Sequence, residues 1–138
     1  MTNQKRPTHR ILIVDDEVAI RRLNTEILTG SGYQVDTAED VASAWERIQF
    51  IKYHLIITDH AMPKATGVEL LKKMHAARMD MPVIMSAAIV PYEDFARSPW
   101  LQPTAILLKP YVTTELLKTV KNVLRATTGL HNGARLPL

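Results

Sequence analysis

Short apolar segments alternate along this chain with longer stretches in which apolar residues recur at three- and four-residue spacing. Ile11–Val14 is apolar throughout and mostly β-branched, which is typical of a strand buried on both faces. Further strands are expected at residues 33–37, 54–58, 82–85 and 105–108. Strands that alternate with amphipathic helices predict an α/β fold with a parallel sheet covered by helices.

The amphipathic stretches predict four long helices. The first covers residues 18–29, and the second runs from an N-cap at Asp40 to about residue 49. The third follows Gly67, and the last has an apolar stripe from Leu116 to Leu124. The inner face of the first helix is expected to consist of Ile20, Leu23, Ile27 and Leu28. Between residues 87 and 104, Pro99 and Pro103 would interrupt a helix. We therefore expect only a short helix there, followed by an irregular stretch.

Four of the five predicted strands end in polar residues that suit metal or phosphate chemistry. These residues are Asp15 and Asp16, Asp59, Ser86, and Lys109. Ligands of open parallel sheets bind beyond the carboxyl ends of the strands, so these side chains should converge. Three carboxylates at one point would repel each other unless a hard cation such as Mg²⁺ joined them. An ammonium and a hydroxyl beside that cation would complete a site for a phosphoryl group.

Taken singly, each of these residues has an ordinary structural interpretation. Asp15, Asp16 or Ser86 could cap the helix that follows, and Asp59 could form an Asx turn. Lys109 could be a surface lysine. Their joint occurrence, in order and at strand ends, favours a functional site over these separate explanations.

Composition limits the class of protein further. A chain of 138 residues fits one domain, and we expect it to span residues 10–126, between a flexible N-terminal tail (1–9) and a C-terminal tail (127–138). Cysteine is absent, which excludes disulfides and thiolate chemistry. The sequence has no signal-peptide pattern and no apolar run of membrane-spanning length, so a cytoplasmic protein is expected.

The net charge of +3 arises outside the predicted domain core. Residues 11–126 hold 13 basic and 14 acidic residues, and the other basic residues lie near the ends of the chain. A nucleic-acid-binding surface requires basic residues clustered on one face, so we expect no nucleic-acid partner.

Four segments resemble motifs of the receiver domains of bacterial response regulators. Residues 11–17 (ILIVDDE) resemble the acidic pair of that family, and residues 55–63 (LIITDHAMP) with Gly67 resemble its phosphorylation loop. Residues 84–87 (IMSA) and 107–110 (LLKP) resemble its hydroxyl and lysine motifs. The resemblance covers about residues 10–126. It implies a flavodoxin-like, doubly wound sheet with strand order 2-1-3-4-5 and helices on both faces.

The resemblance also implies a role for each site residue. Asp59 would be the phosphorylated nucleophile, and Asp16, Asp59 and the Ala61 carbonyl would bind Mg²⁺ directly. Asp15 would bind the ion through water, while Ser86 and Lys109 would hold the phosphoryl group with the amides of Ala61 and Ala87. The Lys109-Pro110 bond would be cis. Ala61 and Ala88 would occupy positions that control access of the hydrolytic water.

The implied function is that of a two-component switch and not of a turnover enzyme. A sensor histidine kinase or phosphotransfer protein would supply the phosphoryl group, and a downstream protein effector, or a second copy in a homodimer, would respond. Many receivers have an aromatic residue three positions before the lysine, but this chain has Ile106. We therefore expect the signal to pass through residues 87–100 instead.

Other functions fit less well. A haloacid-dehalogenase-like phosphotransferase would need a second acid at position 61, which is alanine. A dinucleotide- or flavin-binding protein would need a glycine-rich turn after the first strand, where this chain has acids. A phosphate sink that does not switch, and a receiver-like module that is never phosphorylated, are the remaining alternatives.

Overall fold

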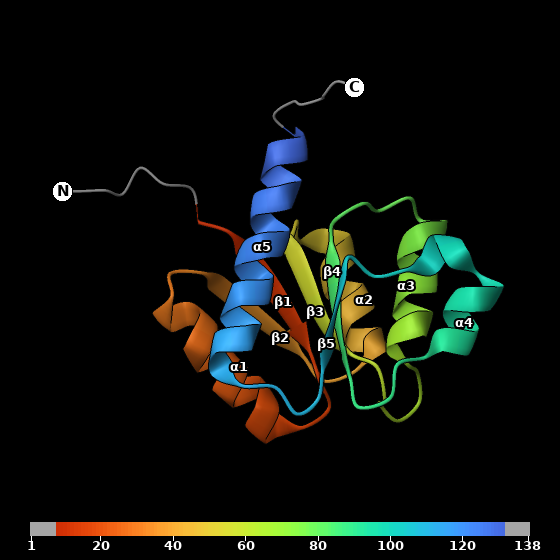
Figure 1. Ribbon diagram of the computed structural model, residues 1–138, viewed down its shortest axis with the longest axis horizontal. Coiled ribbons are helices and arrows are strands. Elements are labelled where there is room, and N and C mark those ends of the chain that lie inside the picture. The colour runs from red at the N-terminus through yellow and green to blue at the C-terminus, as the bar shows by residue number, and fades with distance from the viewer. Residues whose placement is uncertain (1–7, 132–138) are drawn as a thin grey trace.

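The computed structural model describes residues 8–131, which form a five-stranded parallel sheet between two layers of helices (Figure 1). The strands are β1 (Arg10–Val14), β2 (Gln34–Ala38), β3 (Leu55–Asp59), β4 (Val83–Ala87) and β5 (Ala105–Leu108). The helices are α1 (Val18–Gly30), α2 (Val41–Phe50), α3 (Gly67–Ala76), α4 (Tyr92–Arg97), the 3-10 turn η1 (Pro99–Leu101) and α5 (Thr113–His131). The strand order is β2-β1-β3-β4-β5, which confirms the predicted fold class.

Residues of the central strands alternate between two hydrophobic cores, because successive side chains of a strand point to opposite faces. Ile11 and Ile13 pack with α1 and α5 on one face of the sheet. Leu12 and Val14 pack with α2, α3 and α4 on the other. All four residues are buried, so the continuous apolar run of β1 reflects burial on both faces.

The inner face of α1 differs from the prediction at one position. Leu23 was expected to face the core, but its side chain is 52% exposed, whereas Asn24 is buried. The side-chain amide of Asn24 donates a hydrogen bond to the Tyr111 hydroxyl at 2.9 Å. A buried amide is tolerated when it has such a partner, and apolar spacing alone could not reveal a partner so distant in sequence.

The helix boundaries agree with the capping signals. The carboxylate of Asp40 accepts a hydrogen bond from the Ser43 amide at 2.8 Å, as an N-cap does. Thr66 and Glu69 form a reciprocal capping box that fixes the start of α3. This second cap was not predicted, although it lies directly beside the loop that follows Asp59.

The segment before β5 and the last helix differ in how far they follow the apolar pattern. The region from residue 87 to 104 contains the short α4 and η1, which begins at Pro99, as its prolines predicted. Helix α5 continues to His131, beyond its apolar stripe, which ends at Leu124. The expected N-terminal and C-terminal tails lie largely outside the described residues, so the domain bounds of 10 and 126 stay a prediction. Among residues 8–131, no helix combines the length and apolar character needed to cross a bilayer.

Candidate functional site

The polar residues predicted from the strand ends meet at one edge of the sheet. Asp15 directly follows β1, Asp59 is the last residue of β3, and Lys109 directly follows β5. Ser86 lies near the end of β4 and is paired in register with Asp59. Because all strands are parallel, these carboxyl ends are neighbours although they come from distant parts of the chain.

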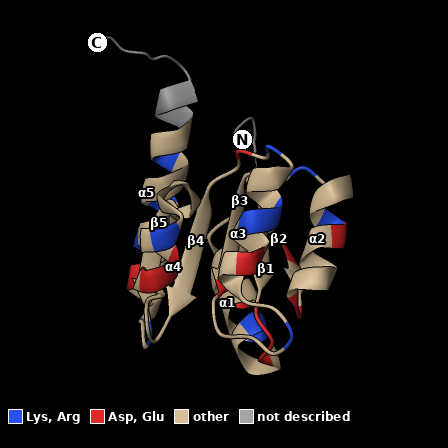
Figure 2. Ribbon diagram, turned by 90° about the vertical axis from the view of Figure 1, so that its right-hand side faces the viewer, with Lys and Arg blue, Asp and Glu red and all other residues tan. Residues whose placement is uncertain are grey.

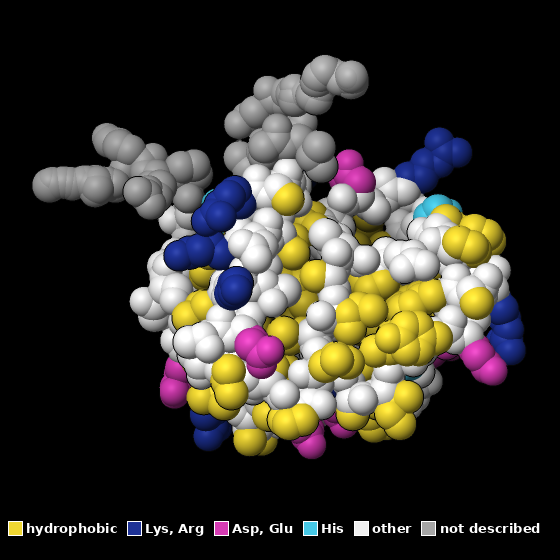
Figure 3. All heavy atoms as spheres, viewed as in Figure 1, with side chains coloured by type: hydrophobic (Ala, Val, Ile, Leu, Met, Phe, Trp, Pro, Cys, Tyr) yellow, Lys and Arg dark blue, Asp and Glu magenta, His cyan; other side chains and the backbone are white. Residues whose placement is uncertain are grey.

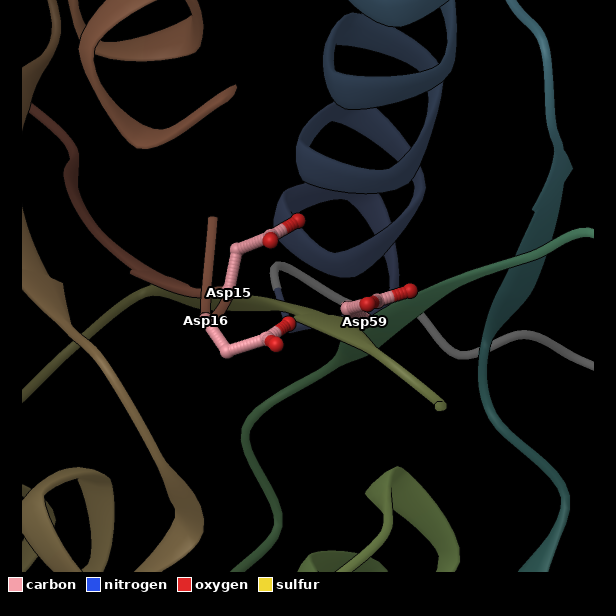
Figure 4. Close-up of side chains that lie close together, drawn as sticks. All are labelled: Asp15, Asp16 and Asp59. Carbon is pink, nitrogen blue, oxygen red and sulfur yellow. The ribbon is translucent and has the colours of Figure 1, made fainter. Parts of the chain in front are cut away.

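Asp15, Asp16 and Asp59 form a cluster of carboxylates (Figure 4). One carboxylate oxygen from each residue lies within 4.8 Å of the other two. Asp15 and Asp59 are buried, whereas Asp16 is exposed at the mouth of the cluster. Three acids so close together create a strongly negative, oxygen-lined site that solvent can reach from the side of Asp16.

The electrostatics of Asp15 reflect this crowding. Burial, together with the nearby charges of Asp59 and Asp16, raises the pKa of the Asp15 carboxyl to about 6. Two contacts hold the residue in place. Its carboxylate accepts a hydrogen bond from the Glu17 amide at 2.9 Å, and its backbone carbonyl accepts one from the Arg21 guanidinium at 2.7 Å. The raised pKa therefore reflects mainly the burial of the carboxyl, to which repulsion from Asp59 and Asp16 adds.

Lys109 lies on the other side of Asp59. Its ammonium group is 2.9 Å from the Asp59 carboxylate, and the lysine side chain is only partly exposed. Burial by itself would lower the pKa of Lys109, but the hydrogen bond to Asp59 and the charges of Asp59 and Asp15 outweigh burial and hold that pKa above its usual value. The lysine is therefore a fixed positive charge at the edge of the acidic cluster.

The loop after β3 is fastened to the site by backbone contacts. The His60 amide donates to the Ser86 carbonyl at 2.9 Å, and the Gly67 amide donates to the His60 carbonyl at 3.0 Å. A Cβ atom at Gly67 would lie 2.9 Å from the Asp59 carbonyl oxygen. Real Cβ atoms essentially never approach backbone so closely, so a glycine lets the start of α3 pack directly against the end of β3.

The remaining predicted residues surround the mouth of the site. Ala61 and Ala88 are exposed, whereas Ser86 and Ala87 are buried. The Lys109 amide donates to the Ala87 carbonyl at 2.9 Å, which places the segment after β5 beside the end of β4. The Lys109-Pro110 peptide bond is cis, as the resemblance implied.

Two supporting contacts were missed from the sequence. Arg21, on α1, reaches back to the Asp15 carbonyl, and the Asn24–Tyr111 hydrogen bond joins the same helix to the segment after Lys109. In the sequence, the only indication of a buried role for Asn24 was that a polar residue stands on the inner face of this helix. These contacts tie α1 to both sides of the acidic cluster.

The donor set fits a divalent cation of the magnesium type. The cluster offers only oxygen ligands and is open on one side for water. Besides burial, the charges of Asp59 and Asp16 raise the pKa of Asp15, and a cation would relieve this repulsion. Mg²⁺ favours such sites because it retains several waters and binds one or two carboxylates. Within the described part of the chain, no other group of three or more acidic, histidine or cysteine side chains has this geometry.

Comparisons with known proteins agree with this geometry. The family model of the response regulator receiver domain matches residues 11–121. The phosphate regulon transcriptional regulatory protein PhoB of Klebsiella pneumoniae is 33% identical over 118 residues, which are 84% of this chain and 52% of PhoB. The probable transcriptional regulator ycf27 of Cyanophora paradoxa is 32% identical, over 86% of this chain and 49% of that protein. The chain thus spans about half the length of the curated relatives it matches.

Solved structures show the same similarity. The receiver domain protein of Methanospirillum hungatei has a TM-score of 0.81 and 32% identity, over 87% of this chain and 96% of that one. Response regulator TrrA of Thermotoga maritima, solved in complex with Mg²⁺ and BeF, has a TM-score of 0.75 and 33% identity. That alignment covers 84% of this chain and 99% of TrrA.

Proposed function

This chain belongs to the response regulator receiver domain family, and we propose that it accepts a phosphoryl group on Asp59 from a phosphohistidine of a partner protein. The observation that carries the proposal is the position of Asp59, between two further carboxylates and the ammonium of Lys109 at 2.9 Å. A carboxylate so placed is a nucleophile whose surroundings can neutralise an incoming phosphoryl group.

The reaction requires little acid–base chemistry. A carboxylate oxygen of Asp59 forms a bond to phosphorus while the bond from phosphorus to the donor imidazole nitrogen breaks, and the electron pair leaves with the imidazole. Asp59 is already an anion when it attacks, so no base has to remove a proton. The residues of the site therefore act mainly by position and charge.

We assign the other site residues by the charge that develops. Lys109 would bind an oxygen of the transferred group, and the Ser86 hydroxyl would donate a hydrogen bond to another. Asp15, Asp16, Asp59 and the Ala61 carbonyl would hold Mg²⁺, with Asp15 acting through water. When bound, the cation supplies positive charge against the phosphoryl oxygens, which a cluster of three carboxylates would otherwise repel.

The partners follow from the same reaction. The phosphoryl donor would be a sensor histidine kinase or a phosphotransfer protein, and both imply a cytoplasmic location. A protein effector, or a second copy of this chain, would respond, because exposed apolar side chains gather over α4 and β5 (Figure 3). The exposed apolar residues of these two elements are Tyr92, Ile106 and Leu108, and Ile89, Trp100 and Val112 are exposed in the segments that adjoin them.

A direct nucleic-acid partner is not proposed. The relatives named above are transcriptional regulators, but the chain spans about half of their length. Lys and Arg are mixed with Asp and Glu along α2 and α3 instead of forming a basic face (Figure 2). The absence of a nucleic-acid partner therefore stays a prediction for this chain.

Intact-mass analysis after incubation with acetyl phosphate and Mg²⁺ tests the proposal. A single phosphoryl adduct is expected on the wild-type protein and on Asp80→Asn, a matched control in which an exposed acid is changed. The adduct should be absent from Asp59→Asn and from EDTA-treated protein. An adduct of equal yield in Asp59→Asn would show that the nucleophile lies elsewhere and would refute the proposal.

A further inference from the structure

A cleft lies at the free edge of the sheet, and Arg21, which donates to the Asp15 carbonyl, links it to the carboxylate cluster. Strand β2 pairs only with β1, and α1 and α2 lie on opposite faces beside it (Figure 1). The cleft is an open depression of about 530 Å³ between these elements. A smaller cavity of about 250 Å³ adjoins it and shares Arg21, Thr37 and Arg47 with it. Together they form a groove along β2.

Three arginines give this groove its charge. Arg21 and Arg22 line it from α1, and Arg47 lines it from α2. Within residues 8–131, none of the three forms an ion pair. Unpaired guanidinium groups that face a common cleft leave it positively charged and open to an anion.

The acidic residues of the cleft offset this charge only in part. Asp36 is already engaged, because its carboxylate lies 3.0 Å from the Arg10 guanidinium and accepts a hydrogen bond from the Tyr53 hydroxyl at 2.7 Å. Glu26 also lines the cleft, and Glu39 lines the adjoining cavity. Three guanidinium groups therefore face two acids, Glu26 and Glu39, whose charges are not otherwise paired.

A further observation points to a missing partner. The hydroxyl oxygen of Thr25, which also lines the cleft, is buried and has no hydrogen-bond partner. An unsatisfied buried hydroxyl is costly, so such groups usually have a ligand or a water beside them. Arg21 is in addition held in position by its hydrogen bond to the Asp15 carbonyl at 2.7 Å. The cleft thus combines free cations, a free hydroxyl and one arginine that is already oriented.

We propose that this cleft binds a small polyanion that carries phosphate-type groups. The planar guanidinium presents paired N–H donors that match two oxygens of one phosphate, which makes arginine the side chain best suited to such groups. Arg21 and Arg47 would hold one anionic group where the two cavities meet. Arg22 would hold a second group, together with the Thr25 hydroxyl once that side chain has rotated out of its buried position, and Val18 and Val35 would contact the uncharged part of the ligand.

Inorganic pyrophosphate, titrated into the ¹⁵N-labelled chain of 138 residues in EDTA, tests this site. Chemical shift changes are expected at Thr25, Val35 and Thr37, and they should saturate. Arg22→Gln and Arg47→Gln should each weaken the affinity about tenfold, as the loss of one charge-assisted contact does. The matched control is Arg125→Gln on α5, where an exposed arginine outside the cleft is changed. It should leave the affinity within about twofold of wild type.

Three results would overturn the proposal. Shift changes confined to the neighbours of Asp59 and Lys109 would place the anion in the carboxylate cluster instead. An equal loss of affinity in Arg125→Gln would show that only the general surface charge attracts pyrophosphate. Saturation of the cleft by a hexaglutamate peptide, with no response to pyrophosphate, would identify it as a groove for an acidic chain. Because the measurement is made without Mg²⁺, its outcome is independent of whether Asp59 accepts a phosphoryl group.

Discussion

The ammonium of Lys109 lies 2.9 Å from the carboxylate of Asp59, so the residue proposed to accept the phosphoryl group is already paired with a cation in the unmodified protein. Lys109 therefore acts in two opposed ways. It would attract the oxygens of an incoming phosphoryl group, and it repels a divalent cation that binds to the same carboxylates.

Replacing Lys109 by methionine separates these effects. Without the ammonium charge, the affinity of the carboxylate cluster for Mg²⁺ should increase about tenfold or more, while the rate of phosphoryl labelling by acetyl phosphate should fall. Backbone NMR titration with Mg²⁺ and time-resolved intact-mass analysis measure the two quantities. Lys118→Met, which removes an exposed lysine of α5, should change neither. A weaker affinity for Mg²⁺ in Lys109→Met would contradict this account.

The raised pKa of Asp15 predicts how the stability of metal-free protein varies with pH. Its carboxyl has a pKa of about 6 in the folded chain, against 3.8 for the unperturbed group, so the folded state binds the proton more tightly. The contribution of Asp15 to the free energy of unfolding should therefore fall as the pH rises from about 4 to 6. In EDTA, Asp15→Asn should stabilise the protein at pH 7.5 and have less effect at pH 5.

Chemical denaturation at the two pH values measures this difference. Asp80→Asn serves as the control, because it removes an exposed carboxylate. With saturating Mg²⁺ the effect of Asp15→Asn should reverse at pH 7.5, since the ionised carboxylate then helps to hold the cation. A stabilisation by Asp15→Asn that is equal at pH 5 and pH 7.5 in EDTA would show that the pKa of Asp15 is not raised.

A side chain at position 67 should disturb the packing of α3 against the end of β3. An added Cβ would lie 2.9 Å from the Asp59 carbonyl oxygen and 3.1 Å from the Cα atom of His60. Gly67→Ala should therefore destabilise the protein by about 1 to 3 kcal/mol, as overpacking does, and slow the labelling of Asp59. Gly30→Ala is a matched control, since its Cβ would have no neighbour within 4 Å. Equal stability of the two variants would exclude the steric argument.

The sequence was sufficient to predict the strands and the main site residues, but not the contacts that surround them. The convergence of Asp15, Asp59, Ser86 and Lys109 follows from parallel strands whose carboxyl ends share one edge, whereas the strand order was implied by the resemblance to receiver domains. The features that could not be predicted depend mostly on tertiary contacts between residues distant in sequence. The burial of Asn24 depends on the distant Tyr111 hydroxyl, and the cleft beside β2 depends on where three arginine side chains lie in space. Sequence spacing contains no information about either.

The lifetime of the phosphoryl group should depend on Ala61 and Ala88. Both residues are exposed and carry only a methyl group, so neither can exclude or orient the water that hydrolyses an acyl phosphate. We expect hydrolysis to depend on access, and hence Ala61→Arg and Ala88→Arg to change the dephosphorylation rate severalfold. Loss of the phosphoryl adduct with time, followed by mass, measures the rate. Rates that are unchanged in both variants would contradict the prediction, and Ala96→Arg on α4 is the control for added charge.

The presence of Ile106 affects which segment is expected to change conformation when Asp59 is phosphorylated. It lies on β5, its side chain is 36% exposed, and a β-branched aliphatic residue has few rotamers and no polar tip with which to signal a change. Phe95 on α4 is buried, whereas Tyr92 on α4 and Trp100 on η1 are exposed. Movement of α4 would therefore change the apolar surface that a partner meets.

We expect Ser86 to move towards the bound group and residues 87–100 to respond, because α4 and η1 are short and hold few buried side chains. The driving force can only be the difference in contacts between the two states, here those of the phosphoryl group with Ser86 and Lys109. Backbone NMR with beryllofluoride and Mg²⁺ measures the response, and Asp59→Asn is the control. Shift changes that reach residues 87–100 would support a relay to a protein partner. Changes restricted to the neighbours of Asp59 would favour a phosphate sink, since the surface available to partners would then be the same in both states.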